Sequence, residues 1–191
     1  VRNSVLGYWL SRGDFGIAAT ITLALQLLET LSDLGADRLV VQADDADAPG
    51  VMAASHATML VRGTLTSAVL YLGAGLATDF FNVAHARAAF EIAALVPLLK
   101  AFMHLEPRRR QRALDNRASL AVEIVPQAAA LVLTVPMLAF HPSYVVVVWL
   151  GLAQAVLGVL TSHGLARTPY EVSFARAGLG RWILQGARTD R

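Results

Sequence analysis

Ionisable and amide side chains recur at helical spacing inside apolar stretches of this sequence. Gln26, Glu29 and Asp33 are separated by three and four residues, so their side chains share one face of a helix. Glu123 and Gln127, four residues apart in another apolar stretch, share a face in the same way. Because such groups are costly inside a lipid bilayer, they usually face a cavity or a charged partner. They are therefore the first candidates for a binding site.

Two cations, Arg62 and Lys100, also lie inside apolar stretches. Arginine binds phosphate through a planar pair of N–H donors, whereas carboxylates and amides bind hydroxyl groups. A layer that contains both kinds would suit an anionic, sugar-bearing head group. The alternative is that each group lies near a helix end and extends to the membrane surface. The candidate binding residues are Arg62, Glu29, Gln26, Glu123, Gln127, Lys100 and Asp33.

No pattern for catalysis or cofactor binding accompanies these residues. The sequence contains no nucleophile elbow, phosphate-binding loop or zinc motif, and it has no cysteine. The histidines fall near expected membrane surfaces and show no metal-binding spacing, which favours exposed side chains without a special role. We therefore expect no catalytic residue, no metal and no cofactor. The histidines are His56, His85, His104, His141 and His163.

The composition indicates a chain that does not face only water. Hydrophobic residues make up 55% of the 191 residues and charged residues 16%, whereas a soluble domain carries roughly 25% charged residues. A soluble helix bundle is disfavoured because 131–140 and 144–152 contain no polar stripe. We therefore expect an all-α, polytopic membrane helix bundle. The five stretches of spanning length are 15–34, 57–77, 83–105, 120–140 and 144–163.

The breaks between these stretches have the features of membrane turns. Asp14 precedes the first full span and is expected to be its N-cap. Prolines inside the spans, such as Pro97, are compatible with membrane helices, in which neighbouring groups satisfy the freed carbonyls. The turns are alternately rich and poor in arginine, and this pattern predicts that 38–56, 106–117 and the tail after 163 face the cytoplasm. Because the arginine run at 106–117 lies between two spans, we expect no nucleic-acid partner.

A series of short motifs resembles the polysaccharide (O-antigen) flippases. The turn Leu10-Ser11-Arg12-Gly13-Asp14-Phe15-Gly16 is similar to the first external turn of that family. Further matches follow in the same order along the chain, and the ordered set covers nearly all of it. These matches are Asp33-Leu34-Gly35 with Leu39-Val40-Val41-Gln42, Arg62-Gly63, Ala77-Thr78-Asp79-Phe80-Phe81, Ser162-His163 with Arg167 and Tyr170, and Gly180-Arg181-Trp182-Ile183.

This resemblance implies an architecture. Members of the family have two bundles of six or more helices each. By that comparison, residues 1–191 are the N-terminal transmembrane bundle, with the end of helix one, helices two to six and the linker toward helix seven. The chain begins with Val1, and we expect a fragment whose second lobe is missing.

The resemblance also implies a function. It predicts translocation of a polyprenyl-diphosphate-linked oligosaccharide across the inner (plasma) membrane by alternating access, without enzymatic chemistry. The expected energy source is an H⁺ or Na⁺ gradient or the membrane potential. The expected partners are the lipid-linked oligosaccharide, membrane lipid and other polysaccharide assembly proteins.

Three other functions remain open. A multidrug or metabolite exporter of the same superfamily would have a smaller cavity with one dominant carboxylate. A membrane-embedded glycosyltransferase would need paired catalytic acids or large loops, which the sequence does not show. A non-catalytic membrane scaffold is compatible with a single bundle.

Overall fold

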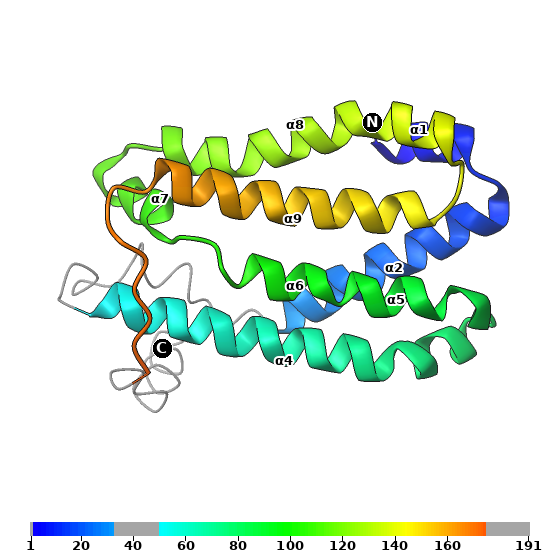
Figure 1. Cartoon of the computed structure of the whole chain (residues 1–191), viewed down its shortest axis with the longest axis horizontal. Helices are drawn as coiled ribbons and strands as arrows, with labels where there is room; N and C mark the ends of the chain where they lie inside the picture. The colour runs from blue at the N-terminus through cyan, green and yellow to red at the C-terminus, as the bar shows by residue number, and fades with distance from the viewer. Residues whose placement is uncertain (1, 33–49, 175–191) are drawn as a thin grey trace, which may run out of the picture.

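The computed structural model describes residues 2–32 and 50–174 (Figure 1). Every regular element in these two ranges is helical. The elements, in chain order, are α1 (Arg2–Trp9), α2 (Arg12–Leu31), α4 (Val51–Phe80), η1 (Ala84–Ala86), α5 (Arg87–Ala93), α6 (Leu95–Lys100), α7 (Glu106–Arg109), η2 (Arg110–Ala113), α8 (Arg117–Phe140) and α9 (Val145–Leu165).

Four of these helices, namely α2, α4, α8 and α9, are long and apolar enough to cross a membrane. They match the first, second, fourth and fifth expected spans, and large apolar side chains such as Leu72, Leu76 and Val132 are exposed along them. Helix α4 has 30 residues, so at about 1.5 Å per residue it is longer than a hydrocarbon core of about 30 Å. The fold is thus an all-α membrane helix bundle.

The third expected span, 83–105, is not one continuous helix in the structure. The region contains the short helices α5 and α6, which are separated at Ala94 and lie end to end along α4 (Figure 1). Pro97 has no N–H group, and its ring displaces the carbonyl four residues earlier. The interruption therefore lies at the turn where proline disrupts the hydrogen-bond ladder.

The start of α2 also differs from the prediction. The N-cap is Ser11, and its side-chain oxygen accepts a hydrogen bond of 3.1 Å from the Asp14 N–H. The Ser11 hydroxyl in turn donates to the Asp14 carboxylate at 2.6 Å. Asp14 lies in the first helical turn, where its negative charge complements the helix dipole.

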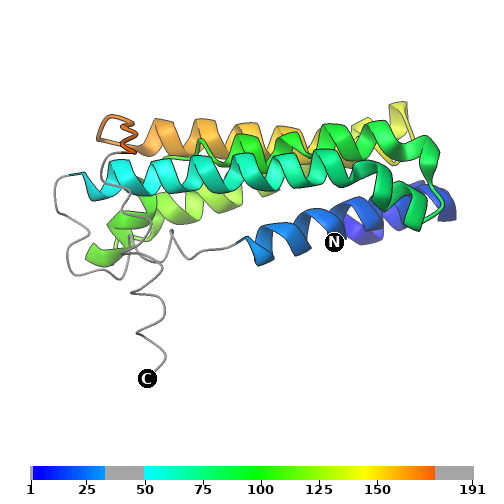
Figure 2. The ribbon, with the colours of Figure 1, turned by 90° about the horizontal axis from the view of Figure 1, so that it is seen from below.

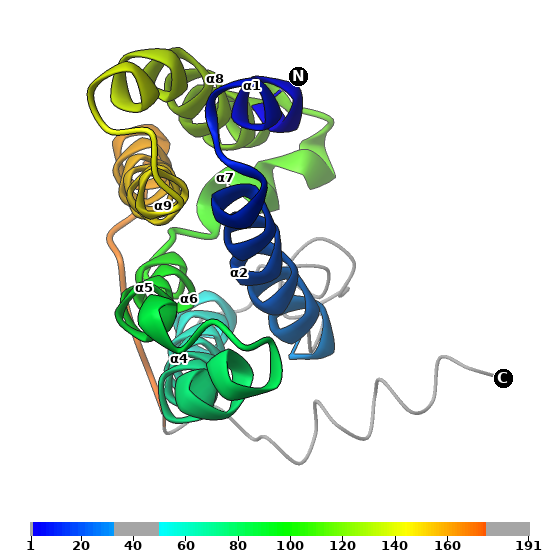
Figure 3. The same ribbon diagram turned by 90° about the vertical axis from the view of Figure 1, so that its right-hand side faces the viewer.

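The helices form a curved row with α2 on one side. Seen end-on, α8, α9, the α5–α6 pair and α4 follow one another in the row (Figure 3). Figure 2 shows α2 on one side of the row and the chain that follows α9 on the other. A core cluster that includes Ile21, Phe90 and Val148 lies where α2 meets α5 and α9. The turns after α4 and α8 lie at one end of the bundle and α7 lies at the other (Figure 1).

Candidate functional site

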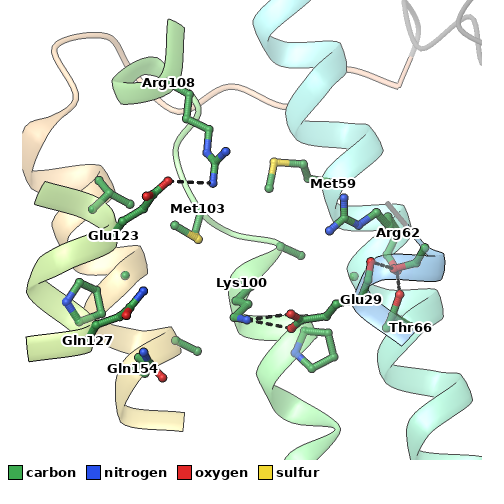
Figure 4. A pocket seen from close by; sticks show the side chains of 18 residues that line it. Glu29, Met59, Arg62, Thr66, Lys100, Met103, Arg108, Glu123, Gln127 and Gln154 are labelled. Atoms are coloured by element: carbon green, nitrogen blue, oxygen red, sulfur yellow. Dashed lines mark hydrogen bonds and ion pairs between the residues drawn. The ribbon is translucent and has the colours of Figure 1, made fainter. Parts of the chain in front are cut away.

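A cavity of about 320 Å³ lies between α2 and the row of helices (Figure 4). Its walls come from α2, α4, α6, α7, α8 and α9. This volume is at the lower end of the roughly 300–1,000 Å³ typical of small-molecule pockets, so the cavity can hold a head group rather than an oligosaccharide. Its polar lining residues are Glu29, Ser32, Arg62, Thr66, Lys100, Arg108, Glu123, Gln127 and Gln154.

The structure brings together most of the candidate binding residues. Five of them line the cavity, although they come from four different helices. Gln26 is exposed on α2 and is not part of the lining, and Asp33 lies outside the described residues. The five that line the cavity are Glu29, Arg62, Lys100, Glu123 and Gln127.

Glu29 forms an ion pair with Lys100 across the cavity. The Lys100 Nζ lies 2.8 Å from Glu29 Oε1 and 3.0 Å from Oε2, so one ammonium group binds both carboxylate oxygens (Figure 4). The side chains are 27% and 45% exposed, respectively. An ion pair with this exposure contributes at most about 1 kcal/mol to stability. Its main effect is to keep two opposite charges at fixed places in the wall.

Four polar lining residues were not among the sequence candidates: Ser32, Thr66, Arg108 and Gln154. Arg108 of α7 lies 3.9 Å from Glu123 at one edge of the cavity, but in the sequence it belongs to an arginine-rich loop. Gln154 lines the cavity from α9, on the same side as Gln127 (Figure 4). The sequence could have indicated Gln154, because it is the one amide side chain in the sequence of α9.

The described lining has more positive than negative charge. Three cations, Arg62, Lys100 and Arg108, oppose two carboxylates, Glu29 and Glu123, which leaves a formal charge of +1. A cavity with fixed cations attracts anions, and its walls of low dielectric constant strengthen that attraction. The arrangement can therefore bind a negatively charged group and offer amides and carboxylates to adjacent hydroxyls.

Gly63 allows α4 and α6 to approach each other beside this cavity. A Cβ atom at Gly63 would lie 2.4 Å from Ala101 Cβ and 2.7 Å from the Pro97 carbonyl oxygen. Real Cβ atoms do not come this close, so any larger residue must separate the two helices. Because Gly63 follows Arg62, this contact also fixes how far Arg62 lies from α6.

We predict that Gly63→Ala lowers the free energy of unfolding by roughly 1–3 kcal/mol, as overpacking in a tight core does. Thermal unfolding in detergent is the measurement. Gly73→Ala is the matched control, because Gly73 lies on the same helix with nothing within 4 Å of the added Cβ. Equal Tm values for the two variants would contradict the proposed close contact.

The expectation that the histidines are exposed is wrong for two of them. His56 and His104 are 0% and 3% exposed, respectively. Their rings lie 5.0 Å apart between centroids, and the ring of Tyr170 packs against His56 at 4.3 Å. The sequence pattern missed this cluster because the burial comes from the chain after α9, which folds back over both rings.

The fold and the cavity define a class: a membrane helix bundle with a polar, net-cationic cavity. The family model described as polysaccharide biosynthesis protein matches residues 5–187, nearly the whole chain. The chain therefore belongs to this family, in agreement with the motif resemblance. No curated protein and no solved structure matches the chain significantly. Family membership supports a role in polysaccharide synthesis or export.

Proposed function

We propose that this chain is the N-terminal bundle of a transporter that moves a polyprenyl-diphosphate-linked oligosaccharide across the plasma membrane. The observation that carries the proposal is the excess of cations in a cavity that is lined by the four spanning helices together with α6 and α7. A diphosphate is the most highly charged part of such a substrate, and arginine is the side chain that binds it best. Membership in the polysaccharide biosynthesis family supports a glycan as the other part of the proposed substrate.

The proposed mechanism is alternating access without covalent chemistry. The diphosphate and its first sugar occupy the cavity, while the lipid tail stays in the bilayer and the rest of the glycan extends outside. A second bundle completes the site, and the two bundles rock about the bound head group. An ion gradient or the membrane potential supplies the energy. On this proposal the chain is a transporter and not an enzyme.

The charge of the cavity favours this proposal over the exporter alternative, whereas its small volume of about 320 Å³ does not. An exporter of the same superfamily is expected to depend on one dominant carboxylate. In the described lining, both carboxylates are paired with cations, Glu29 with Lys100 and Glu123 with Arg108. We therefore expect the cations of the lining, rather than a single carboxylate, to supply the free energy of binding by contacting an anionic ligand.

Complementation tests the proposal. The full-length gene is expressed in a strain that lacks its flippase for lipid-linked oligosaccharides, and surface polysaccharide is measured. We expect export to be restored when the strain makes the matching glycan. Higher drug tolerance without restored export would instead support the exporter function. Accumulation of lipid-linked oligosaccharide on the cytoplasmic side, despite normal membrane levels of the protein, would refute the proposal.

A further inference from the structure

The chain that follows α9 is held against the side of the bundle away from α2. Residues 166–174, which we call the strap, run from the end of α9 to the first turn of α4 (Figures 1 and 3). At its far end, the Ser173 N–H donates to the Ala53 carbonyl at 3.1 Å. His56 Nδ1–H donates to the Glu171 carbonyl at 2.9 Å. The strap is thus bonded to α4 as well as being continuous with α9.

Glu106, the first residue of α7, anchors the other end of the strap. It is 3% exposed, and one of its oxygens, Oε2, accepts hydrogen bonds from the N–H groups of Arg167 and Thr168 and from the Thr168 hydroxyl. Burial by itself raises the pKa of Glu106, but the hydrogen bonds from Thr168 and Arg167 outweigh this effect and hold the pKa below its usual value. The buried carboxylate is therefore ionised at neutral pH.

His104 adds a second anchor from the segment between α6 and α7. Its Nε2–H donates to the Thr168 carbonyl at 3.1 Å, and its Nδ1 accepts from the Glu106 N–H at 3.1 Å. Burial, together with the neighbouring His163, lowers the pKa of His104, which keeps the ring neutral with the proton on Nε2. His56 likewise donates from one ring nitrogen and accepts at the other: its Nδ1–H binds the Glu171 carbonyl, and its Nε2 accepts from the Leu105 N–H at 3.2 Å.

The segment that carries these anchors also forms a wall of the cavity. Met103 and Arg108 line the cavity, whereas His104 and Glu106, which lie between them in sequence, bind the strap. Residues within one short, buried stretch thus face two different structures. A displacement of the strap must pull on α7, and α7 carries the arginine at the cavity edge.

We propose that Glu106 is a positioning residue that ties the strap to α7, so that the strap and Arg108 move together. The part that concerns Arg108 as a ligand rests on the function proposed above. In a transporter with a second bundle, a movement of that bundle that displaces the strap would also displace α7. The hydrogen bonds between Glu106 and the strap would then transmit a movement between the bundles to Arg108, which contacts the head group.

The first experiment measures the strap directly. The double variant Ala53→Cys/Ser173→Cys places two cysteines at backbone-bonded positions, in a chain that has no other cysteine. Its rate of disulfide formation in membranes is expected to fall roughly tenfold when Glu106→Ala removes the hydrogen bonds to the charged acceptor. Glu106→Gln, which keeps an acceptor oxygen, is expected to have a smaller effect. Glu91→Gln is the matched control, because Glu91 pairs with Arg87 and does not contact the strap.

The second experiment measures the link to the cavity. In the single variant Arg108→Cys, the rate of modification by a charged thiol reagent is expected to change several-fold with Glu106→Ala and to stay constant with Glu91→Gln. An unchanged cross-linking rate refutes the anchor, and changed cross-linking with unchanged modification refutes the coupling. If Glu106→Ala does not accumulate, Glu106→Gln decides both questions. Neither measurement depends on transport, so a failure of the proposed function leaves them interpretable.

Discussion

Replacing Arg62 with alanine is expected to reduce polysaccharide export by roughly ten- to a hundredfold, which corresponds to the 1.5–3 kcal/mol of a hydrogen bond to a charged group. Arg62 lines the cavity from α4, one turn before Thr66 and directly before the close helix contact at Gly63. Its backbone is therefore held firmly while its guanidinium group faces the cavity. Arg62→Lys is expected to recover part of the export, because lysine keeps the charge but loses the planar pair of donors.

The assay is export in a flippase-deleted strain, normalised to the amount of protein in the membrane. Arg12→Ala is the matched control, because Arg12 is an exposed arginine in the first turn of α2 and does not line the cavity. Full export by a normally expressed Arg62→Ala variant would remove this residue from the binding site. It would also remove the best candidate for diphosphate binding in this bundle.

A second large effect is expected when the charge of Lys100 is reversed. Lys100→Glu places a carboxylate beside Glu29, where the native ammonium lies 2.8–3.0 Å from both oxygens. It also changes the formal charge of the described lining from +1 to −1, since three cations and two carboxylates become two and three. Like charges repel each other and an anionic ligand is no longer attracted, so we expect at least a roughly tenfold loss of export.

The exchanged pair Glu29→Lys/Lys100→Glu separates the two causes. It restores both the ion pair and the net charge, although the carboxylate then lies on α6 and the ammonium group on α2. We expect this double variant to reach the wild-type level in the membrane and to recover part of the export. If export stays absent at a normal protein level, Lys100 contacts the ligand itself. Wild-type export by the single variant Lys100→Glu would show that this pair has no role in the cavity.

Removing both charges of the Glu29–Lys100 pair is expected to have a smaller effect than reversing the charge of Lys100. Because Glu29 and Lys100 are 27% and 45% exposed, water can solvate either charge when its partner is absent. Deleting both therefore changes stability by at most about 1 kcal/mol. Charge reversal is the sharper experiment, since it adds a repulsion that water only partly screens.

The sequence by itself determined the class of fold and five of the nine polar residues that line the cavity. Four of the five predicted spans match long apolar helices, because a run of apolar residues long enough to cross a bilayer is a local property of the chain. The polar faces of α2 and α8 were predicted because spacings of three and four residues place Glu29, Glu123 and Gln127 on defined sides of their helices. Orientation and function, which rest on charge asymmetry and resemblance, stay predictions.

The tertiary structure decided which residues meet. The partner of Glu29 is Lys100, 71 residues later in the chain, and no local pattern could choose between Lys100 and Arg62. The stretch around Pro97 is expected to cross the membrane, and only the structure shows that it divides at Ala94 into α5 and α6, in the turn where proline disrupts the hydrogen-bond ladder. His56 and His104 are buried, and Glu106 is ionised in the interior, only because the strap folds back and supplies backbone hydrogen-bond partners. Such contacts join distant segments, and their energy depends on the assembled fold rather than on any neighbouring residues in the sequence.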